Sequence, residues 1–257
     1  MTRGKLLALL PPILFGISFL LAWETFVVVR DIKPYLLPKP SAIWGQFHGN
    51  FELIRKATQV TGTNAFIGLL LGVALGSITA FVASRFKALS ELIAPTAIAV
   101  SAMPIIVLVA IFNDLFSITS EIPRRLMVTV VVFFLVFINV SKGLSQADAT
   151  QLELMRSYGA GEAEIIRKVR VPHALEFFFV ALRQAAPLAV VTAFVSEYFG
   201  GLQNGLGSRI SQSIANSKDA AGWAYVSGAC LLGLSFFVLS IVLERGAMPW
   251  KARRSSR

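Results

Sequence analysis

The chain of 257 residues is poor in several features on which enzymes and secreted domains depend. It has one cysteine, Cys230, so no disulfide framework is available. Its two histidines, His48 and His173, are far apart in the sequence, which argues against a metal site. No G-x-x-x-x-G-K-[ST] motif occurs, so the chain lacks the usual P-loop for ATP hydrolysis. No G-x-S-x-G motif indicates a hydrolase embedded in a membrane.

Charge is also scarce, whereas apolar residues are abundant. Only 15% of the residues are charged and 55% are hydrophobic, and the mean hydropathy is +0.69. A soluble domain of this size could not bury so much apolar surface. The composition therefore indicates an integral membrane protein. The formal charge of +10 then indicates loops that face anionic lipid rather than a nucleic-acid partner.

Long apolar runs set the expected architecture. A helix needs roughly 17 to 25 mostly apolar residues to cross a bilayer. The first run could instead be a signal peptide, but it is long and lacks a small-x-small cleavage site, so an anchor is favoured. We expect an all-α polytopic protein with six transmembrane helices. The six runs are Leu6–Val29, Ala65–Ala83, Leu92–Phe112, Leu126–Leu144, Phe177–Phe199 and Ala224–Leu243.

The distribution of basic residues predicts the orientation in the membrane. With the N-terminus inside, fourteen Lys and Arg residues near span ends face the cytoplasm and nine face the other side. The positive-inside rule therefore places both termini in the cytoplasm of a cell (inner or plasma) membrane. The same orientation puts the one long polar loop on that side, residues Ala147–Pro172, in the cytoplasm.

That loop has the pattern of two short helices joined at glycines. Asp148 is a candidate N-cap for the first helix. Gly159 and Gly161 interrupt the helical pattern, and Pro172 is expected to end the second helix. The loop Ala147–Pro172 is therefore predicted to form a rigid elbow.

The elbow also carries a family resemblance. Its residues are Glu153, Gly159 six residues later, Ile165 or Ile166, and Pro172. This pattern resembles the EAA loop in the membrane-spanning subunits of ATP-binding-cassette (ABC) importers. The chain departs from that pattern by having the bulkier Leu154 and Met155 where two alanines are usual.

The resemblance implies a type I ABC importer (MetI-like) permease fold and a set of partners. These are a cytoplasmic ABC ATPase, which would bind ATP and Mg²⁺, an extracytoplasmic solute-binding protein, and a second permease subunit, expected to be an identical copy. The chain itself would need no cofactor and would not be an enzyme. The residues implied to contact the ATPase are Leu152, Glu153, Ser157, Tyr158, Gly159 and Ala160.

Two further stretches resemble one branch of these permeases. LLPKPSAIW follows the first span, and EYFGGLQNGLGSRI, residues Glu197–Ile210, follows the fifth. The branch serves nitrate, sulfonates and taurine, and includes permeases for thiamine-pyrimidine precursors or riboflavin. The resemblance therefore implies import of a small organic solute of one of these kinds.

The spans contain candidate residues for a translocation pathway. Proline in a membrane helix frees backbone carbonyls that need partners or line a cavity, and charges inside a span are costly. A structural kink at the prolines, snorkelling of the arginine to the cytoplasm and an interfacial position for the glutamate are the alternatives. The candidates are Met103, Pro104, Asn113, Arg183 and Glu197.

Small residues recur every four positions in two spans. The second span has Gly68, Gly72, Gly76, Ala80 and Ser84, and the fifth has Ala181, Ala185, Ala189 and Ala193. Such ridges allow close approach of membrane helices. These two spans are therefore predicted to form the packed centre.

Residues 1–59 are expected to form an N-terminal anchor with an extracytoplasmic linker, and residues 60–257 the permease core. The rival function is a self-contained secondary transporter or channel. That class predicts inverted repeats and ionisable residues near the bilayer midplane. The sequence shows no convincing repeat and few such charges.

Overall fold

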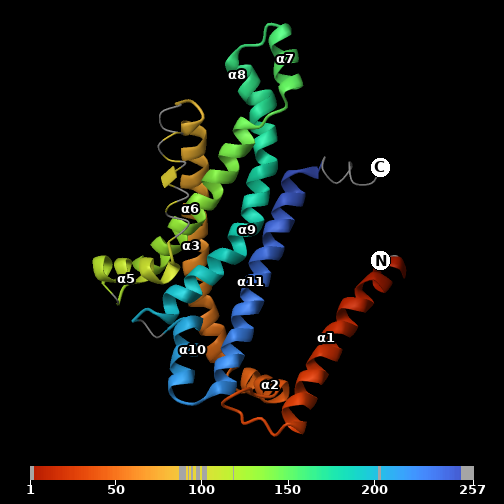
Figure 1. The fold of residues 1–257 in the computed structure, drawn as a ribbon, viewed down its shortest axis with the longest axis vertical. Helices are drawn as coiled ribbons and strands as arrows, with labels where there is room; N and C mark the ends of the chain where they lie inside the picture. Colours follow the sequence, from red (N-terminus) through yellow and green to blue (C-terminus); the bar gives the residue numbers. More distant parts are fainter. Residues whose placement is uncertain are drawn as a thin grey trace.

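The computed structural model describes residues 3–86, 91, 93, 95, 96, 99, 103–117, 119–201 and 204–249. Within these residues every regular element is helical (Figure 1). The elements are α1 (Arg3–Val29), α2 (Pro40–Gly49), α3 (Phe51–Ala83), α5 (Ile105–Phe116), α6 (Ile122–Ser145), α7 (Ala149–Ser157), α8 (Glu162–Ile165), a π-helical turn (Ile166–Arg170), α9 (Val171–Tyr198), α10 (Leu206–Ala215) and α11 (Asp219–Ala247).

Five described segments are long and apolar enough to cross a bilayer, which confirms five of the six predicted spans. They are Leu10–Val29, Phe51–Ala83, Ile122–Ser145, Glu162–Tyr198 and Asp219–Ala247. The other predicted span, Leu92–Phe112, falls partly outside the described residues. Its described end belongs to the shorter apolar helix α5.

Helix α3 begins earlier than the span predicted from Ala65. Its 33 residues correspond to about 50 Å, whereas the hydrocarbon layer is about 30 Å thick. The first turns carry a narrow buried stripe at Ile54, Ala57, Thr61 and Asn64. Charged residues on the other faces of the helix lower the mean hydropathy of this segment, so hydropathy along the chain did not reveal the stripe. The extension carries polar side chains beyond the apolar part of α3.

The centre of the bundle is the packing of α3, α6 and α9. Small residues of α3 lie against α6 so closely that a Cβ atom on Gly68 would fall 2.4 Å from the Val128 Cβ, and one on Gly72 would fall 2.7 Å from the Val132 Cβ. The alanine ridge of α9 is also buried in this core. Both predicted ridges are therefore confirmed, except that Ser84, at the end of the first, is exposed.

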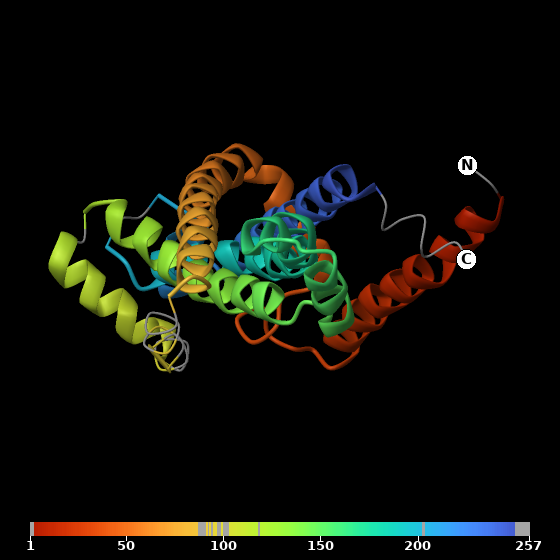
Figure 2. The same ribbon diagram turned by 90° about the horizontal axis from the view of Figure 1, so that it is seen from above.

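The two ends of the bundle differ. The α7–α8 elbow projects at one end, and α2 and α10 lie at the other (Figure 1). Helix α1 diverges from the bundle, as both views show (Figure 2). Its Glu24 carboxylate accepts hydrogen bonds from Ser41 N and Oγ, at 3.0 and 2.7 Å. It thereby provides an acceptor for a backbone N–H group in the first turn of α2.

Candidate functional site

The elbow between α7 and α8 is built by local backbone chemistry. Asp148 caps α7, since its side chain accepts a hydrogen bond from Thr150 N at 2.9 Å. At the other end Gly159 has φ +72°, the left-handed conformation that glycine adopts without strain. Gly159 N donates to Arg156 O at 2.9 Å, and Ala160 N donates to Met155 O at 3.0 Å. This pair of bonds is a Schellman motif, which ends α7 in a defined geometry.

The elbow exposes most of the side chains that the sequence singled out for ATPase contact. Tyr158 is 81% exposed and Leu154 is 54% exposed. Glu153, Ser157 and Gly159 are also exposed, and Leu152 and Ala160 are half-buried. The described residues provide Glu153 with no side-chain hydrogen bond or ion pair. The elbow thus exposes the apolar side chains of Leu154 and Tyr158 and the carboxylate of Glu153 at the end of the bundle.

The expectation that Pro172 ends the second short helix is wrong. Helix α8, the π-helical turn and α9 follow one another without a break, and Pro172 lies in the first turn of α9. In the π turn Val171 N donates to Ile166 O, five residues back. This wider turn comes just before the proline, whose missing N–H and bulky ring disturb regular α-helical pairing. The elbow is therefore joined directly to a long helix.

The candidate pathway residues do not come together in the described structure. Met103 and Pro104 precede the first residue of α5, and Asn113 lies in the second half of this helix. Helix α5 packs at one side of the bundle, against α6 and α9. Arg183 pairs with Glu244, near the C-terminal end of α11, with 3.0 Å between Nε and Oε2. Glu197 lies near the far end of α9. No shared pathway is defined by these five residues.

Glu197 is fully buried, so it is not the interfacial residue considered from the sequence. Its Oε2 accepts hydrogen bonds from Thr61 Oγ1 at 2.7 Å and from Gly207 N at 3.2 Å. Thr61 Oγ1 in turn accepts from Leu206 N at 2.9 Å. The carboxyl group of α9 and the hydroxyl of α3 therefore cap α10, whose first N–H groups need acceptors.

Two glycines make this capping contact sterically feasible. A Cβ atom on Gly205 would fall 2.2 Å from the Glu197 carboxyl, and one on Gly207 would fall 2.1 Å from Phe194 O. The glycine-rich stretch after the fifth span is thus a close-packed junction that leads into α10.

Glu197→Leu is expected to destabilise the protein much more than Glu197→Gln. The leucine leaves the Thr61 hydroxyl and Gly207 N without an acceptor, at about 1–3 kcal/mol for each stranded donor. The glutamine keeps a carbonyl oxygen in the same place. Thermal unfolding of both variants in detergent measures the difference. Equal midpoints for the two variants would show that capping by Glu197 contributes nothing.

A second polar cluster lies beside this junction and was not singled out from the sequence. Arg124 is 2% exposed, and its Nη1 donates to Glu121 Oε2 at 2.9 Å and to Asn204 Oδ1 at 2.8 Å. Asn204 Nδ2 donates to Glu121 Oε1, and Asn64 Nδ2 to Glu121 Oε2, both at 2.7 Å. The cluster ties α3 and α6 to the chain segment before α10.

The electrostatics of the cluster favour an ionised Glu121. Burial by itself would raise the pKa of this carboxyl, but hydrogen bonds from Asn204 and Asn64, with the Arg124 charge, outweigh burial and hold the pKa below its usual range. The only sequence signal was Glu121 three residues before Arg124, a helical spacing. In the count of Lys and Arg residues that predicts the orientation in the membrane, Arg124 is only one of the nine on the outer side.

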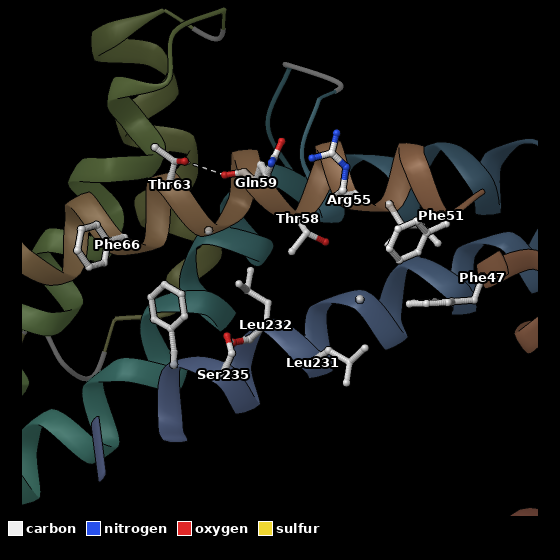
Figure 3. A pocket seen from close by; sticks show the side chains of 14 residues that line it. Phe47, Phe51, Arg55, Thr58, Gln59, Thr63, Phe66, Leu231, Leu232 and Ser235 are labelled. Atoms are coloured by element: carbon white, nitrogen blue, oxygen red, sulfur yellow. Dashed lines mark hydrogen bonds between the residues drawn. The ribbon is translucent and has the colours of Figure 1, made fainter. Parts of the chain in front are cut away.

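An open groove of about 630 Å³ lies between α3 and α11 (Figure 3). Its floor is mainly apolar and includes Leu231 and Leu232 of α11. Figure 3 shows that Arg55, Thr58, Gln59 and Thr63 follow one another along α3 at its edge. Among the residues that the structure describes, no group of three or more His, Cys, Asp or Glu side chains is arranged to hold a metal ion.

Comparisons with known proteins relate this architecture to transport. Residues 72–247 match the family described as "Binding-protein-dependent transport system inner membrane component". The formylaminopyrimidine transport permease protein ThiX of Halalkalibacterium halodurans is 30% identical over 251 residues, which cover 95% of this chain and 97% of that protein. The putative aliphatic sulfonates transport permease protein SsuC of Bacillus subtilis is 24% identical over 248 residues, with 95% and 86% coverage.

A solved structure shares the fold. It is the crystal structure of an amino acid ABC transporter with histidines, which superposes with a TM-score of 0.64 at 18% sequence identity. The superposition covers 77% of this chain and 95% of that chain. The arrangement of helices is therefore that of a MetI-like permease.

Proposed function

The chain belongs to the family of binding-protein-dependent transport system inner membrane components, the permease subunits of ABC importers for small solutes, and on that premise we propose how it works. It spans the cell membrane as the subunit through which solute passes. A separate cytoplasmic ATPase binds ATP and Mg²⁺ and hydrolyses the ATP. An extracytoplasmic binding protein delivers the solute.

The elbow is the observation that carries this proposal. It projects from one end of the bundle, most of its candidate contact residues are exposed, and its turn is fixed by the Schellman motif at Gly159. Leu154 and Tyr158 are four residues apart, so they share a helical face. Their apolar surface would enter a groove of the ATPase, and the free carboxylate of Glu153 would pair with a basic residue beside it.

The continuity between the elbow and α9 supports a mechanical role. The segment Glu162–Tyr198 is 37 residues long, or about 55 Å at an α-helical rise. Glu197, in its last turn, caps α10 at the opposite end of the bundle. A rigid-body movement of the docked elbow would therefore reach the far end of the chain through one helix. ATP binding would shift the transporter between inward-facing and outward-facing states in this way.

The remaining features of the complex follow from the same proposal. Two copies of the chain enclose the path for the solute, and both termini and the elbow lie in the cytoplasm. The excess of basic residues on that side supports this orientation. The solute is a small organic molecule, either sulfonate-like or nitrate-like, or related to thiamine pyrimidines or riboflavin. The names of ThiX and SsuC support these two classes.

Purification of the tagged chain from native membranes tests the proposal. Mass spectrometry should find a P-loop ATPase in stoichiometric amount with the wild-type chain. Liposomes that contain the purified complex and the binding protein should take up solute only with ATP inside. A chain that purifies alone and moves solute without ATP would instead be a self-contained transporter, and the importer proposal would be lost.

A further inference from the structure

A small crevice lies between the N-terminal halves of α3 and α6, on the other side of Gln59 and Thr63, which also line the groove in Figure 3. Its volume is about 380 Å³, which is within the range of about 300–1,000 Å³ that small-molecule sites occupy. One apolar side chain, Val60, belongs to its lining. The other lining side chains end in polar groups, and they are those of Lys56, Gln59, Thr63, Asn64, Glu121 and Arg125.

The guanidinium group of Arg125 is held in place by a neutral amide partner. Its Nε donates to Asn64 Oδ1 at 3.1 Å. Asn64 is 1% exposed, and its own amide is fixed by the hydrogen bond to Glu121. Among the residues that the structure describes, no carboxylate forms an ion pair with Arg125. The remaining donors of Arg125 are therefore available in a preorganised position.

The other charges leave the crevice positive. The Glu121 carboxylate is already engaged by Arg124, Asn204 and Asn64. Lys56 Nζ lies 3.8 Å from Glu52 Oε1, in an exposed pair of the kind that contributes little. The crevice thus combines a fixed guanidinium, an adjustable ammonium and the polar groups of Gln59 and Thr63.

The position of the crevice on α3 makes it accessible from water. The exposed face of α3 is apolar from Phe66 onwards, at Leu70, Leu75 and Ile78. Before Phe66 the exposed residues that line the crevice are polar. Because α3 is about 20 Å longer than the hydrocarbon layer is thick, this polar end lies at the membrane surface or beyond it.

We propose that this crevice binds the oxyanion group of the transported solute, which makes a sulfonate-like anion the substrate class. A guanidinium offers a planar pair of donors to two oxygens of such a group, and an ammonium adds a point charge. A neutral heterocycle would leave Arg125 without a counter-charge and Lys56 with only its weak pairing to Glu52. This inference rests on the proposed function as an importer permease, and it deepens that function by choosing between its two solute classes.

The test uses methanesulfonate as the probe and the complete transporter in nanodiscs of zwitterionic lipid. Saturation-transfer NMR of the methyl resonance gives its Kd. Arg125→Gln should raise the Kd about tenfold or more, and Lys56→Gln should raise it less. Lys33→Gln removes an exposed outer lysine away from the crevice and should leave the Kd unchanged. Dimethyl sulfone, which has nearly the same shape and no charge, should not compete.

Several results would overturn the assignment. An unchanged Kd in both Arg125→Gln and Lys56→Gln would do so, and Lys56 is exposed enough that its variant should fold normally. An equal rise of the Kd in Lys33→Gln would show that the effect comes from general surface charge and not from the crevice. A phospholipid headgroup offers the same chemistry, so native mass spectrometry is repeated with phosphatidylglycerol present. Lipid retained by the wild type and lost from Arg125→Gln, with no methanesulfonate binding, would make the crevice a lipid site.

The same samples separate this inference from its premise. If no ATPase accompanies the wild-type chain, the importer proposal fails. If the ATPase is present but methanesulfonate binding is indifferent to Arg125→Gln and Lys56→Gln, the importer stands and only the oxyanion site is lost.

Discussion

A chain that carries Gly159→Arg is expected to insert and fold but to lose its ATPase and, with it, all ATP-dependent uptake. Gly159 has φ +72°, and a Cβ built there has no other atom within 4 Å. A side chain at residue 159 therefore has room, and its cost is that of the left-handed backbone conformation, about 1–2 kcal/mol for an L-residue. This cost is too small to unfold the protein, and the elbow is remote from the packed core.

The loss of docking has two causes that a second variant separates. Gly159→Ala has the unfavourable φ without the bulk, so it should weaken ATPase retention only partly. Gly159→Arg adds a long cationic side chain at the proposed contact with the ATPase, and should reduce retention and uptake at least tenfold. Retention is measured by co-purification, and uptake by solute accumulation in liposomes.

Gly246→Arg is the matched control for this experiment. Gly246 is exposed in the last turn of α11, on the same predicted side of the membrane, and a Cβ there also has no atom within 4 Å. The same new side chain should therefore be harmless at this position. Wild-type uptake by Gly159→Arg, or an equal loss in Gly246→Arg, would refute the coupling role of the elbow.

Gly72→Leu is expected to prevent stable assembly of the bundle. A Cβ at residue 72 would fall 2.7 Å from the Val132 Cβ and 2.8 Å from Thr129 O. The second neighbour is backbone, so α3 and α6 must move apart along their whole contact. Even Gly72→Ala should cost about 3 kcal/mol. For a chain of this size that cost lowers Tm by roughly 6–12 °C, and the leucine should leave no folded protein in detergent.

Two companion variants show whether crowding is the cause. Gly233→Leu places the same side chain in the middle of α11, where a Cβ has no atom within 4 Å, and should change Tm little. Val132→Ala keeps its Cβ but removes Cγ1, which would lie 2.8 Å from the Cβ added at residue 72, so combined with Gly72→Ala it should recover part of the lost stability. Full stability of Gly72→Ala alone would contradict the close contact between α3 and α6.

Local chemistry made the elbow predictable from the sequence. An N-cap aspartate, a helix of two turns and a glycine at its end are short-range signals, and they gave α7 and its turn correctly. Pro172 misled, because a proline is read as a stop signal, whereas a π turn just before it lets the helix continue.

The sequence determined by itself that this chain is a helical membrane protein, where five helices long and apolar enough to cross the bilayer lie, and which of them have small-residue ridges for close packing. These properties follow from hydropathy and periodicity, which each segment carries alone. Only the tertiary structure decided the partners of the buried polar groups. Glu197 meets Thr61 and Gly207, and Arg124 meets Asn204, across separations of 136, 10 and 80 residues. Pairings between elements depend on how the helices are rotated and stacked, so the capped junction and the positive crevice became visible only in the fold.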